Sequence, residues 1–277
     1  MTRKEAYEYG QEQLKHVQIE EATLDAWYIL EFVTGITRAQ YFLRPEEVMT
    51  TEEEQQYCEA IAKRASHIPL QHITGVQEFM GLEFCVNEHV LVPRQDTEVL
   101  VESVLDELTP GMDILDMCTG SGCILISLLK LGEQVQGTGV DISEEALKVA
   151  KKNAEKIGVE ATILQSDLFA NVSGQYDVIV SNPPYIRTSV IEELKEEVKF
   201  HDPYLALDGK EDGLYFYRKI VSESTAFLKK SGRLYFEIGY DQGDDVKGLM
   251  EEAGFQDVTV KKDLAGLDRV VFGVYNM

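Results

Sequence analysis

The sequence has 277 residues, of which 44% are hydrophobic and 27% charged, so it is long enough for one large or two smaller globular domains. It contains 26 Lys and Arg against 49 Asp and Glu, a formal net charge of −23. Proteins that bind phosphate backbones or anionic lipids usually present a basic surface, so this balance argues against both kinds of partner. We therefore expect no direct nucleic-acid partner and no membrane partner.

Cysteine and histidine usage argues against a metal centre and against disulfides. The four cysteines are Cys58, Cys85, Cys118 and Cys123, and no two of them form a Cys-x-x-Cys pair. The five histidines are scattered, so we expect no metal site and instead expect reduced thiols in a cytoplasmic protein. Charged residues from Arg3 to Glu8 with no apolar segment behind them predict no signal peptide, and no apolar run reaches membrane-spanning length.

Residues 1–75 are predicted to form a small helical bundle. Leu24, Trp27 and Leu30 recur at helical spacing among polar residues, which is typical of a packing face. Thr50 or Thr51, followed by acidic residues, is predicted to start the last long helix. Core packing is the simpler interpretation of these apolar stripes. A role in holding a macromolecular partner stays open, and we interpret the domain as the region that recognises the substrate.

A β-hairpin linker is predicted for residues 76–92, where apolar residues alternate around Gly81 and Asn87. The catalytic domain is then expected to span residues 93–277. Asp96 or Thr97 is predicted to cap the helix that follows. Arg94 lies at this junction, where it could pair with a carboxylate or line the mouth of an active site.

From Asp113 onward, strands alternate with helices, which predicts a doubly wound α/β sheet. The predicted strands are 114–117, 135–140, 161–164, 178–180, 233–238, 258–261 and 269–275. The last two are joined by a short loop that contains Gly266, so we expect them to form an antiparallel hairpin at the edge of the sheet.

A glycine-containing turn, Asp116 to Gly122, follows the first strand of this domain and opens a helix. Glycines there allow a ligand to approach the backbone closely, and Asp141 ends the next strand about 20 residues later, where a carboxylate can reach ribose hydroxyls. The third glycine of a dinucleotide fingerprint is missing, because position 125 is Leu125. No Gly-Lys-Ser/Thr is present either, so an adenosyl ligand without phosphates fits best, and S-adenosylmethionine is such a ligand. Asp167 is placed to accept from an adenine amine.

The run Tyr-Asp-Val-Ile-Val-Ser-Asn-Pro-Pro-Tyr, residues 176–185, predicts a buried strand that ends in a stiff, extended loop. Ligands of open α/β sheets lie at such strand ends. The Asn182 side-chain oxygen and the Pro183 carbonyl can accept two hydrogen bonds from a planar NH2 group, and Tyr185 offers a flat face to the same group. These acceptors would orient a conjugated nitrogen and stabilise the charge that grows on it as it attacks. A turn that merely ends the strand is the alternative.

The chain resembles the release-factor glutamine methyltransferase family, also called HemK or PrmC proteins. The matching segments are Ile-Pro-Leu-Gln-His-Ile-Thr-Gly at 68–75, Val-Pro-Arg-Gln-Asp-Thr-Glu at 92–98, 115–122, Asp141, Ser-Asp at 166–167, 181–186 and 268–270. This resemblance implies a Rossmann-like, seven-stranded methyltransferase domain behind the helical domain. It also implies methyl transfer from S-adenosylmethionine, with S-adenosylhomocysteine as product, to the glutamine of the Gly-Gly-Gln motif in class-one peptide chain release factors.

The resemblance also assigns roles by position. The cofactor-binding residues would be Cys118, Thr119, Gly120, Ser121, Gly122, Asp141, Asp167, Leu168 and Asn182. Asn182, Pro183 and Tyr185 would be catalytic, and the substrate would be bound by these three together with Pro184 and Arg94. Three positions depart from the usual pattern: Cys118 replaces a frequent glycine, Gln95 a proline and Asp202 a glutamate.

Two rival functions remain open at this point. An adenine-amine nucleic-acid methyltransferase would present the same kind of NH2 group to the loop, but it would need base flipping and a basic groove. A non-catalytic cofactor-binding scaffold is the second rival, and binding without turnover would be its signature. The charge and the intact Asn-Pro-Pro-Tyr loop favour the release-factor enzyme, for which a monomer is the default expectation.

Overall fold

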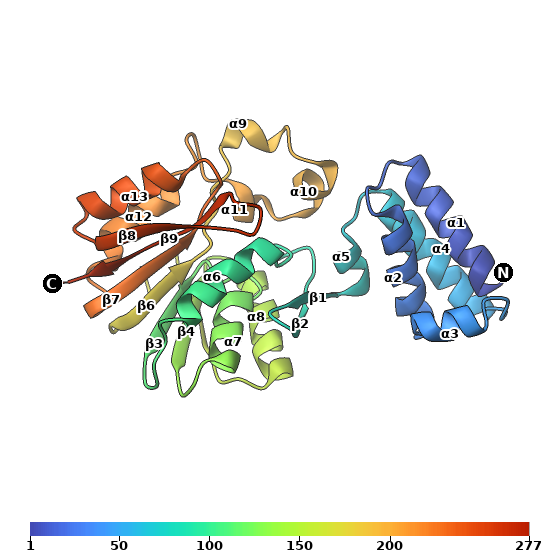
Figure 1. Ribbon diagram of the computed structural model, residues 1–277, viewed down its shortest axis with the longest axis horizontal. Coiled ribbons are helices and arrows are strands. Elements are labelled where there is room, and N and C mark those ends of the chain that lie inside the picture. Colours follow the sequence, from blue (N-terminus) through green and yellow to red (C-terminus); the bar gives the residue numbers. More distant parts are fainter. Residues whose placement is uncertain (277) are drawn as a thin grey trace. The chain divides into compact units, whose positions relative to one another are not determined.

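The computed structural model describes residues 1–276 and divides the chain into two compact units (Figure 1). The smaller unit contains Met1–Gly75 together with Lys195–His201. The larger unit contains Val76–Leu194 and the chain from Asp202 onward. The short segment 195–201 therefore packs with the helical unit, although the sequence prediction assigned it to the catalytic domain.

The smaller unit is entirely helical. Its helices are α1 (Arg3–His16), α2 (Ala22–Thr34), α3 (Arg38–Leu43), α4 (Thr51–Ala65), α5 (Leu70–Thr74) and, from the separate segment, α10 (Glu196–His201). The predicted Thr50 cap is confirmed, because its hydroxyl accepts from the Glu53 N–H in a capping box. The fully buried Leu30, Tyr57 and Ile61 belong to the core of the bundle. The apolar stripes seen in the sequence are thus partly explained by packing.

Ion pairs tie the separate segment to this bundle. Arg64 on α4 is buried and pairs with both Asp25 of α2 and Glu197 of α10, at 2.7 and 2.8 Å. Lys195 pairs with Glu20 at 2.8 Å. A buried guanidinium needs several acceptors, and residue 197 supplies one of them from a distant part of the chain.

The larger unit contains the predicted seven-stranded sheet. Its strands are β3 (Asp113–Met117), β4 (Gln136–Asp141), β5 (Thr162–Gln165), β6 (Tyr176–Ser181), β7 (Leu228–Glu237), β8 (Gln256–Lys262) and β9 (Asp268–Tyr275). Their order across the sheet is β5-β4-β3-β6-β7-β9-β8. The paired strands run parallel except at β9, which is antiparallel to both neighbours, so the predicted antiparallel hairpin is confirmed.

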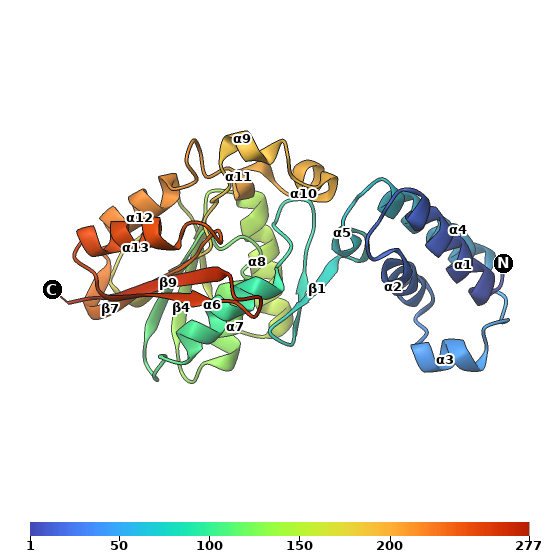
Figure 2. The ribbon, with the colours of Figure 1, turned by 45° about the horizontal axis from the view of Figure 1, so that its top comes forward.

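Helices cover both faces of the sheet (Figure 2). On one face lie α6 (Gln95–Leu105), α7 (Cys123–Leu131) and α8 (Glu144–Ile157), whereas α12 (Tyr215–Ser224) and α13 (Gly243–Glu252) lie on the other. Successive strand residues point to opposite faces, so Val178 and Val180 join the first layer and Ile179 joins the second. This two-sided burial is what the unbroken β-branched run predicted. Two short helices, α9 (Thr188–Ile191) and α11 (Tyr204–Leu207), lie in the connection after β6.

Two local predictions differ from the structure. The predicted hairpin is shorter than 76–92, because β1 (Val76–Phe79) pairs with β2 (Leu82–Cys85) and the strand ends there. The predicted cap of α6 is wrong, because Arg94 is the N-cap residue and no side chain caps the helix. Both expected caps have other surroundings: Asp96 pairs with Arg269 at 3.3 Å, and Thr97 is buried near Glu237, whose pKa it lowers.

Candidate active site

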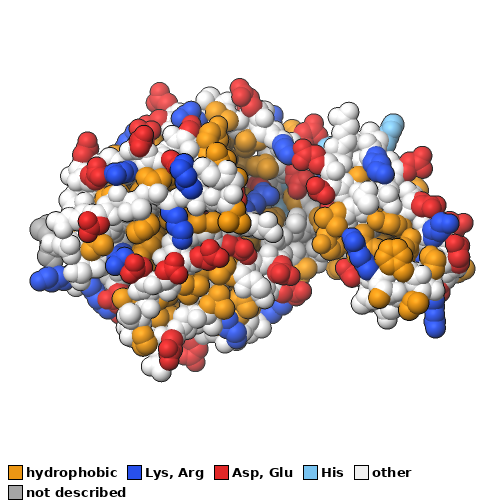
Figure 3. Space-filling view, in the orientation of Figure 1, with side chains coloured by type: hydrophobic (Ala, Val, Ile, Leu, Met, Phe, Trp, Pro, Cys, Tyr) orange, Lys and Arg blue, Asp and Glu red, His pale blue; other side chains and the backbone are white. Residues whose placement is uncertain are grey.

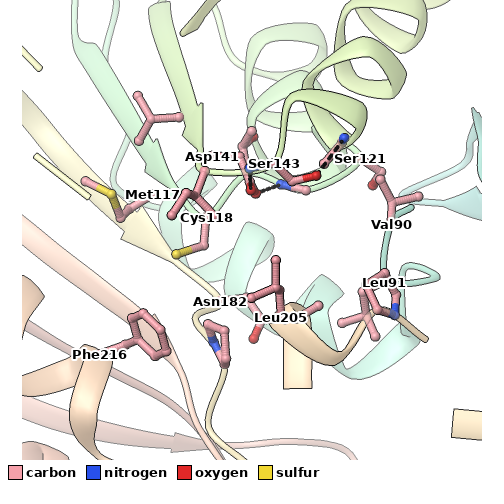
Figure 4. Close-up of a pocket in the computed structure, with 18 of the residues that line it drawn as sticks. Val90, Leu91, Met117, Cys118, Ser121, Asp141, Ser143, Asn182, Leu205 and Phe216 are labelled. Carbon is pink, nitrogen blue, oxygen red and sulfur yellow. Dashed lines mark hydrogen bonds between the residues drawn. The ribbon is translucent and has the colours of Figure 1, made fainter. Parts of the chain in front are cut away.

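The strand order reverses between β3 and β6, and a cavity opens at this point. In open α/β sheets a reversal leaves a crevice beyond the carboxyl ends of the two strands, since their connections diverge to opposite faces. The cavity measures about 310 Å³ and is lined by the ends of β3, β4 and β6 and by the segment around α11. In Figure 4, Asp141 and Ser143 lie on one side of it, and Asn182, Leu205 and Phe216 lie on the other.

The turn after β3 forms one wall of the cavity and contains three residues with positive φ: Cys118, Gly120 and Gly122. A Cβ added to Gly120 would meet nothing nearer than 4.0 Å, so this glycine leaves open space where a ligand can approach the backbone. Gly122 does not line the cavity. A Cβ there would lie 2.7 Å from the Ile126 Cδ1 and 3.2 Å from the Ala150 Cβ, so packing of α7 against α8 explains it.

Asp141 closes the turn from the end of β4. Its two carboxylate oxygens accept from the backbone N–H groups of Gly120 and Ser143, each at 2.9 Å. Burial raises the pKa of Asp141, and these backbone hydrogen bonds oppose the shift. A carboxylate has roughly four acceptor positions, so two remain for hydroxyl donors in the cavity. The carboxylate that the sequence predicts as the ribose ligand is therefore fixed by the turn, and its role in binding ribose stays a prediction.

Asp167 reaches the cavity from the loop after β5. Ser166 fixes this loop, because its hydroxyl donates to the Leu168 carbonyl at 2.6 Å and accepts from the Asn171 N–H at 3.0 Å. Leu168 is buried in a left-handed conformation and lines the cavity next to Asp167. An exposed carboxylate and an apolar side chain thus stand together, which suits the edge and the face of a purine.

The loop after β6 forms the opposite wall. Ser181 fixes its start, because the Ser181 hydroxyl donates to the Met117 carbonyl of β3 at 2.6 Å. Asn182 and Pro184 line the cavity, whereas Pro183 and Tyr185 do not. The Tyr185 ring packs against the sheet core, and its carbonyl accepts from the Gln242 side chain at 3.1 Å. The role of this ring as a stacking surface therefore stays a prediction.

Arg94 lines the cavity and also pairs with a carboxylate, which were the two possibilities left open. Its Nη2 lies 2.8 Å from the Asp202 Oδ2. The Asp202 side chain is 1% exposed and that of Arg94 is 45% exposed, so the pair anchors a partly open guanidinium at the rim. Asp202 stands where glutamate is usual in the family, and it is long enough to make this contact.

Sequence reasoning missed Glu237, the last residue of β7. Its side chain is buried, and the side chains of Thr97 and Asn182 are near enough to lower the pKa of its carboxyl group. Burial raises its pKa to about 7, against the effect of these side chains and of the nearby Arg269. The sequence feature that could have identified it is a single acidic residue inside the apolar run 234–238, because an acid in a buried strand is unusual.

Within residues 1–276, no group of three or more His, Cys, Asp and Glu side chains is arranged to hold a metal ion. The helices described over that range also contain none that is long and apolar enough to cross a membrane.

Comparison with known proteins places the chain in a family. Residues 5–75 match the PrmC N-terminal domain, and residues 94–198 match the methyltransferase small domain. A release factor glutamine methyltransferase from Agrobacterium fabrum is 38% identical, and the match covers 95% of this chain and 93% of the relative. The chain belongs to the release factor glutamine methyltransferase family. A second member, from Geobacter sulfurreducens, is 40% identical over 92% of this chain and 90% of its own length.

A solved structure supports the fold assignment. A methyltransferase from Pyrococcus furiosus superimposes with a TM-score of 0.55 at 17% identity, covering 82% of this chain and all of the other. At that identity the likeness concerns the fold alone. The larger unit thus has a Rossmann-like fold, with the doubly wound sheet that the alternation of strands and helices predicted.

Proposed function

We propose that this protein transfers the methyl group of S-adenosylmethionine to the side-chain amide nitrogen of the glutamine in the Gly-Gly-Gln motif of class-one peptide chain release factors. The observation that supports this most directly is the position of Asn182. It lies at the reversal point of the sheet and faces the same cavity as Gly120 and Asp141. Relatives that match nearly the whole chain carry the name of this activity. Release factors act in the cytoplasm, and we place the enzyme there.

The residues of the cavity fit an adenosyl cofactor. Gly120 leaves space against the backbone, and Asp141 retains acceptor positions for ribose hydroxyls. Asp167 and Leu168 would flank the adenine. The cavity walls are mainly apolar, and neither a Gly-Lys-Ser/Thr loop nor a third glycine is present to hold a pyrophosphate.

Bound S-adenosylmethionine supplies the methyl group on a sulfonium, which is already an activated leaving group. The amide nitrogen of glutamine is a poor nucleophile, because its lone pair is delocalised. Asn182 can accept a hydrogen bond from this NH2 group with its side-chain oxygen, and the Pro183 carbonyl can accept a second. Two fixed acceptors orient the nitrogen and stabilise the positive charge that grows on it. Pro183 and Pro184 keep the loop extended, so little reorganisation is needed.

No strong base is required in this arrangement. The nitrogen gains a methyl group and a positive charge, and it then loses one of its two protons to water. The chain's contribution is therefore position and electrostatics.

The helical unit would recognise the release factor. Apolar side chains of this unit are exposed to water, with 53% of Phe32, 76% of Phe42, 80% of Leu43 and 71% of Val48 accessible. Large exposed apolar groups on a small unit are typical of a surface that contacts another protein. The protein is acidic, so the release factor would offer a locally basic face, and association should slow as salt is raised.

The adenine-amine methyltransferase is the competing function. On the face shown in Figure 3, acidic and basic side chains are interspersed over the larger unit, without a continuous basic area of the kind that holds a phosphate backbone. The net charge of −23 points the same way.

A competition assay tests the proposal. The purified protein is incubated with methyl-labelled S-adenosylmethionine, a class-one release factor and duplex DNA in the same reaction, and the protein and DNA are then digested and analysed for label. We expect label in the release factor and none in DNA. Label in adenine would favour the nucleic-acid enzyme, and cofactor binding without any label would favour the scaffold.

A further inference from the structure

Glu237 lies beside Asn182, across the pairing of two adjacent strands. The parallel register of β6 and β7 pairs Val180 with Tyr235 and Ser181 with Phe236. The next step along both strands brings Asn182 alongside Glu237. This step is where β6 ends and the substrate loop begins, so the last residue of β7 is the strand neighbour of the residue that lines the cavity.

The surroundings of Glu237 leave it few partners. The residue is 2% exposed, and its Oε2 is buried without a hydrogen bond in the structure of residues 1–276. The side chains of Thr97 on α6 and of Asn182 lie within reach of the carboxylate and lower its pKa, against the larger effect of burial. Its backbone carbonyl accepts from the Tyr217 hydroxyl of α12 at 2.9 Å, so the strand end is fixed from the other face as well.

The charged and titratable groups that act on this carboxyl come from several elements. They are Arg269 at the start of β9, Asp96 on α6, Tyr185 in the loop after β6, Tyr217 on α12 and Cys123 on α7. Arg269 is the one cation among them, and it already pairs with Asp263 at 3.0 Å and with Asp96 at 3.3 Å. Glu237 therefore has no guanidinium of its own, and the NH2 group of Asn182 is one of its few donors.

We propose that Glu237 is a positioning residue: its carboxylate accepts from the side-chain nitrogen of Asn182 and thereby keeps the Asn182 oxygen turned toward the substrate amide. This inference rests on the proposed function, in which that oxygen accepts from the glutamine NH2. An Asn amide has one accepting and one donating end. If the amide turned over, it would present an NH2 group to the substrate NH2, and neither could accept. An acceptor-only partner behind Asn182 selects the productive orientation.

The selection depends on ionisation. Protonated Glu237 can donate, and it would then draw the Asn182 oxygen toward itself and away from the cavity. Burial holds the pKa of Glu237 at about 7, which lies inside the working range of a cytoplasmic enzyme. Turnover should therefore rise as pH increases through about 7, where the carboxylate form becomes dominant.

One other buried acid titrates in the same range and must be separated from this effect. Burial also raises the pKa of Asp116 to about 7, and its Oδ2 accepts from the Thr119 hydroxyl at 2.5 Å, under the turn that would hold the cofactor. Its titration should alter cofactor affinity. The pH profile is therefore measured as kcat, at saturating S-adenosylmethionine and saturating release factor.

A double-mutant cycle tests the inference. Glu237→Ala, Asn182→Ala and the double variant are compared with wild type for kcat and for cofactor Kd. We expect Glu237→Ala to lower kcat by about tenfold to a hundredfold and to leave Kd within about twofold, because it disturbs orientation and not cofactor binding. In the Asn182→Ala background it should cost less than about twofold, because its effect passes through Asn182. The inference would be overturned if the two substitutions lowered kcat by factors that multiply in the double variant. It would also be overturned if Glu237→Ala weakened cofactor binding as much as it lowered kcat.

Two conservative variants provide the controls. Glu237→Gln can still accept from Asn182 while its own NH2 group donates to the Thr97 hydroxyl, so it should keep much of kcat at pH 8 and lose the fall in kcat below pH 7. A fall that persists in this variant would contradict the role of Glu237 ionisation. Tyr235→Phe removes a buried hydroxyl two residues earlier on β7 and should leave kcat unchanged.

Failure of the inference can be distinguished from failure of the proposed function. If wild type does not methylate the release factor, the proposed function fails. If wild type methylates it and the Glu237 variants match wild type at every pH, only the inference fails. Thermal unfolding of each variant at the assay pH verifies that the loss of kcat is not a loss of folded protein.

Discussion

The two walls of the cavity are built in different ways. On the cofactor side, backbone N–H groups hold the Asp141 carboxylate. One belongs to Gly120, in the turn that Asp141 faces, and the other to Ser143, two residues after Asp141. On the substrate side, Asn182 is adjacent to Glu237, which is 55 residues away in the chain and on another strand. The cofactor wall is a local motif, whereas the orientation of the substrate wall depends on long-range packing.

This difference explains what the sequence could and could not predict. Gly120, Asp141 and Asp167 were predicted to hold the cofactor, and the structure brings all three to one cavity, because spacing along the strands and turns determines where they lie. The sheet and its antiparallel edge hairpin were predicted for a similar reason, since local periodicity specifies each element. Glu237 was missed because its position next to Asn182 depends on the pairing of β6 with β7, which the sequence of one strand does not reveal.

Other failures have the same cause. Thr97 resembles a helix cap in the sequence, but it lies inside the helix, where it is buried near Glu237, so its tertiary surroundings prevail over the local signal. The segment 195–201 was assigned to the catalytic domain by its place in the chain. It packs with the helical unit through Glu197 and Lys195, and no local pattern reveals the Arg64 and Glu20 that receive them.

The largest expected effect is on the substrate wall. Asn182→Ala should lower kcat by about a hundredfold to a thousandfold, the usual cost of losing an oriented hydrogen-bonding group in an active site. Cofactor Kd, measured by calorimetry, should stay within about twofold. A matching loss of cofactor affinity would mean that Asn182 belongs mainly to the cofactor wall and that the comparison drawn here is wrong.

The buried acid behind that wall should reduce stability at high pH. The folded-state pKa of Glu237, about 7, lies above its ordinary value of 4.5, so its stabilising contribution is complete below about pH 4.5 and is lost as pH rises through 7. Glu237→Gln should thus raise the free energy of unfolding at pH 8 by up to about 3 kcal/mol and change it little at pH 4.5. Urea unfolding at both pH values measures this. An equal effect at the two pH values would show that the carboxyl is not the titrating group.

A substitution in the cofactor wall should weaken cofactor binding and leave kcat nearly unchanged, the opposite of the pattern expected for Asn182→Ala. Asp141→Asn removes the acceptor charge that hydroxyl donors would use, at a cost of about 1.5–3 kcal/mol, or roughly tenfold to a hundredfold in cofactor Kd. At saturating cofactor, kcat should change by only a few fold. A fall in kcat with unchanged Kd would remove Asp141 from the cofactor site.

The last expected effect concerns the stability of the turn itself and not activity. Gly122→Ala should destabilise the fold by about 2–3 kcal/mol, because positive φ costs about 1 kcal/mol and the new Cβ would overpack against Ile126 and Ala150. Gly158→Ala is the matched control, since its φ is also positive but a Cβ would meet nothing within 4 Å. It should cost only about 1 kcal/mol. Equal losses in thermal unfolding would show that packing at Gly122 is not tight.

The central claim is that the loop after β6 selects the conjugated amide nitrogen of one glutamine. Its most direct test is to localise the methyl group by mass spectrometry after incubation with a class-one release factor and, in parallel, with the same factor in which the Gly-Gly-Gln glutamine is replaced by glutamate. We predict one methyl group on the side-chain nitrogen of that glutamine and no methylation of the replaced factor. Methylation that persists in the replaced factor, or that lies on any other atom, would contradict the claim.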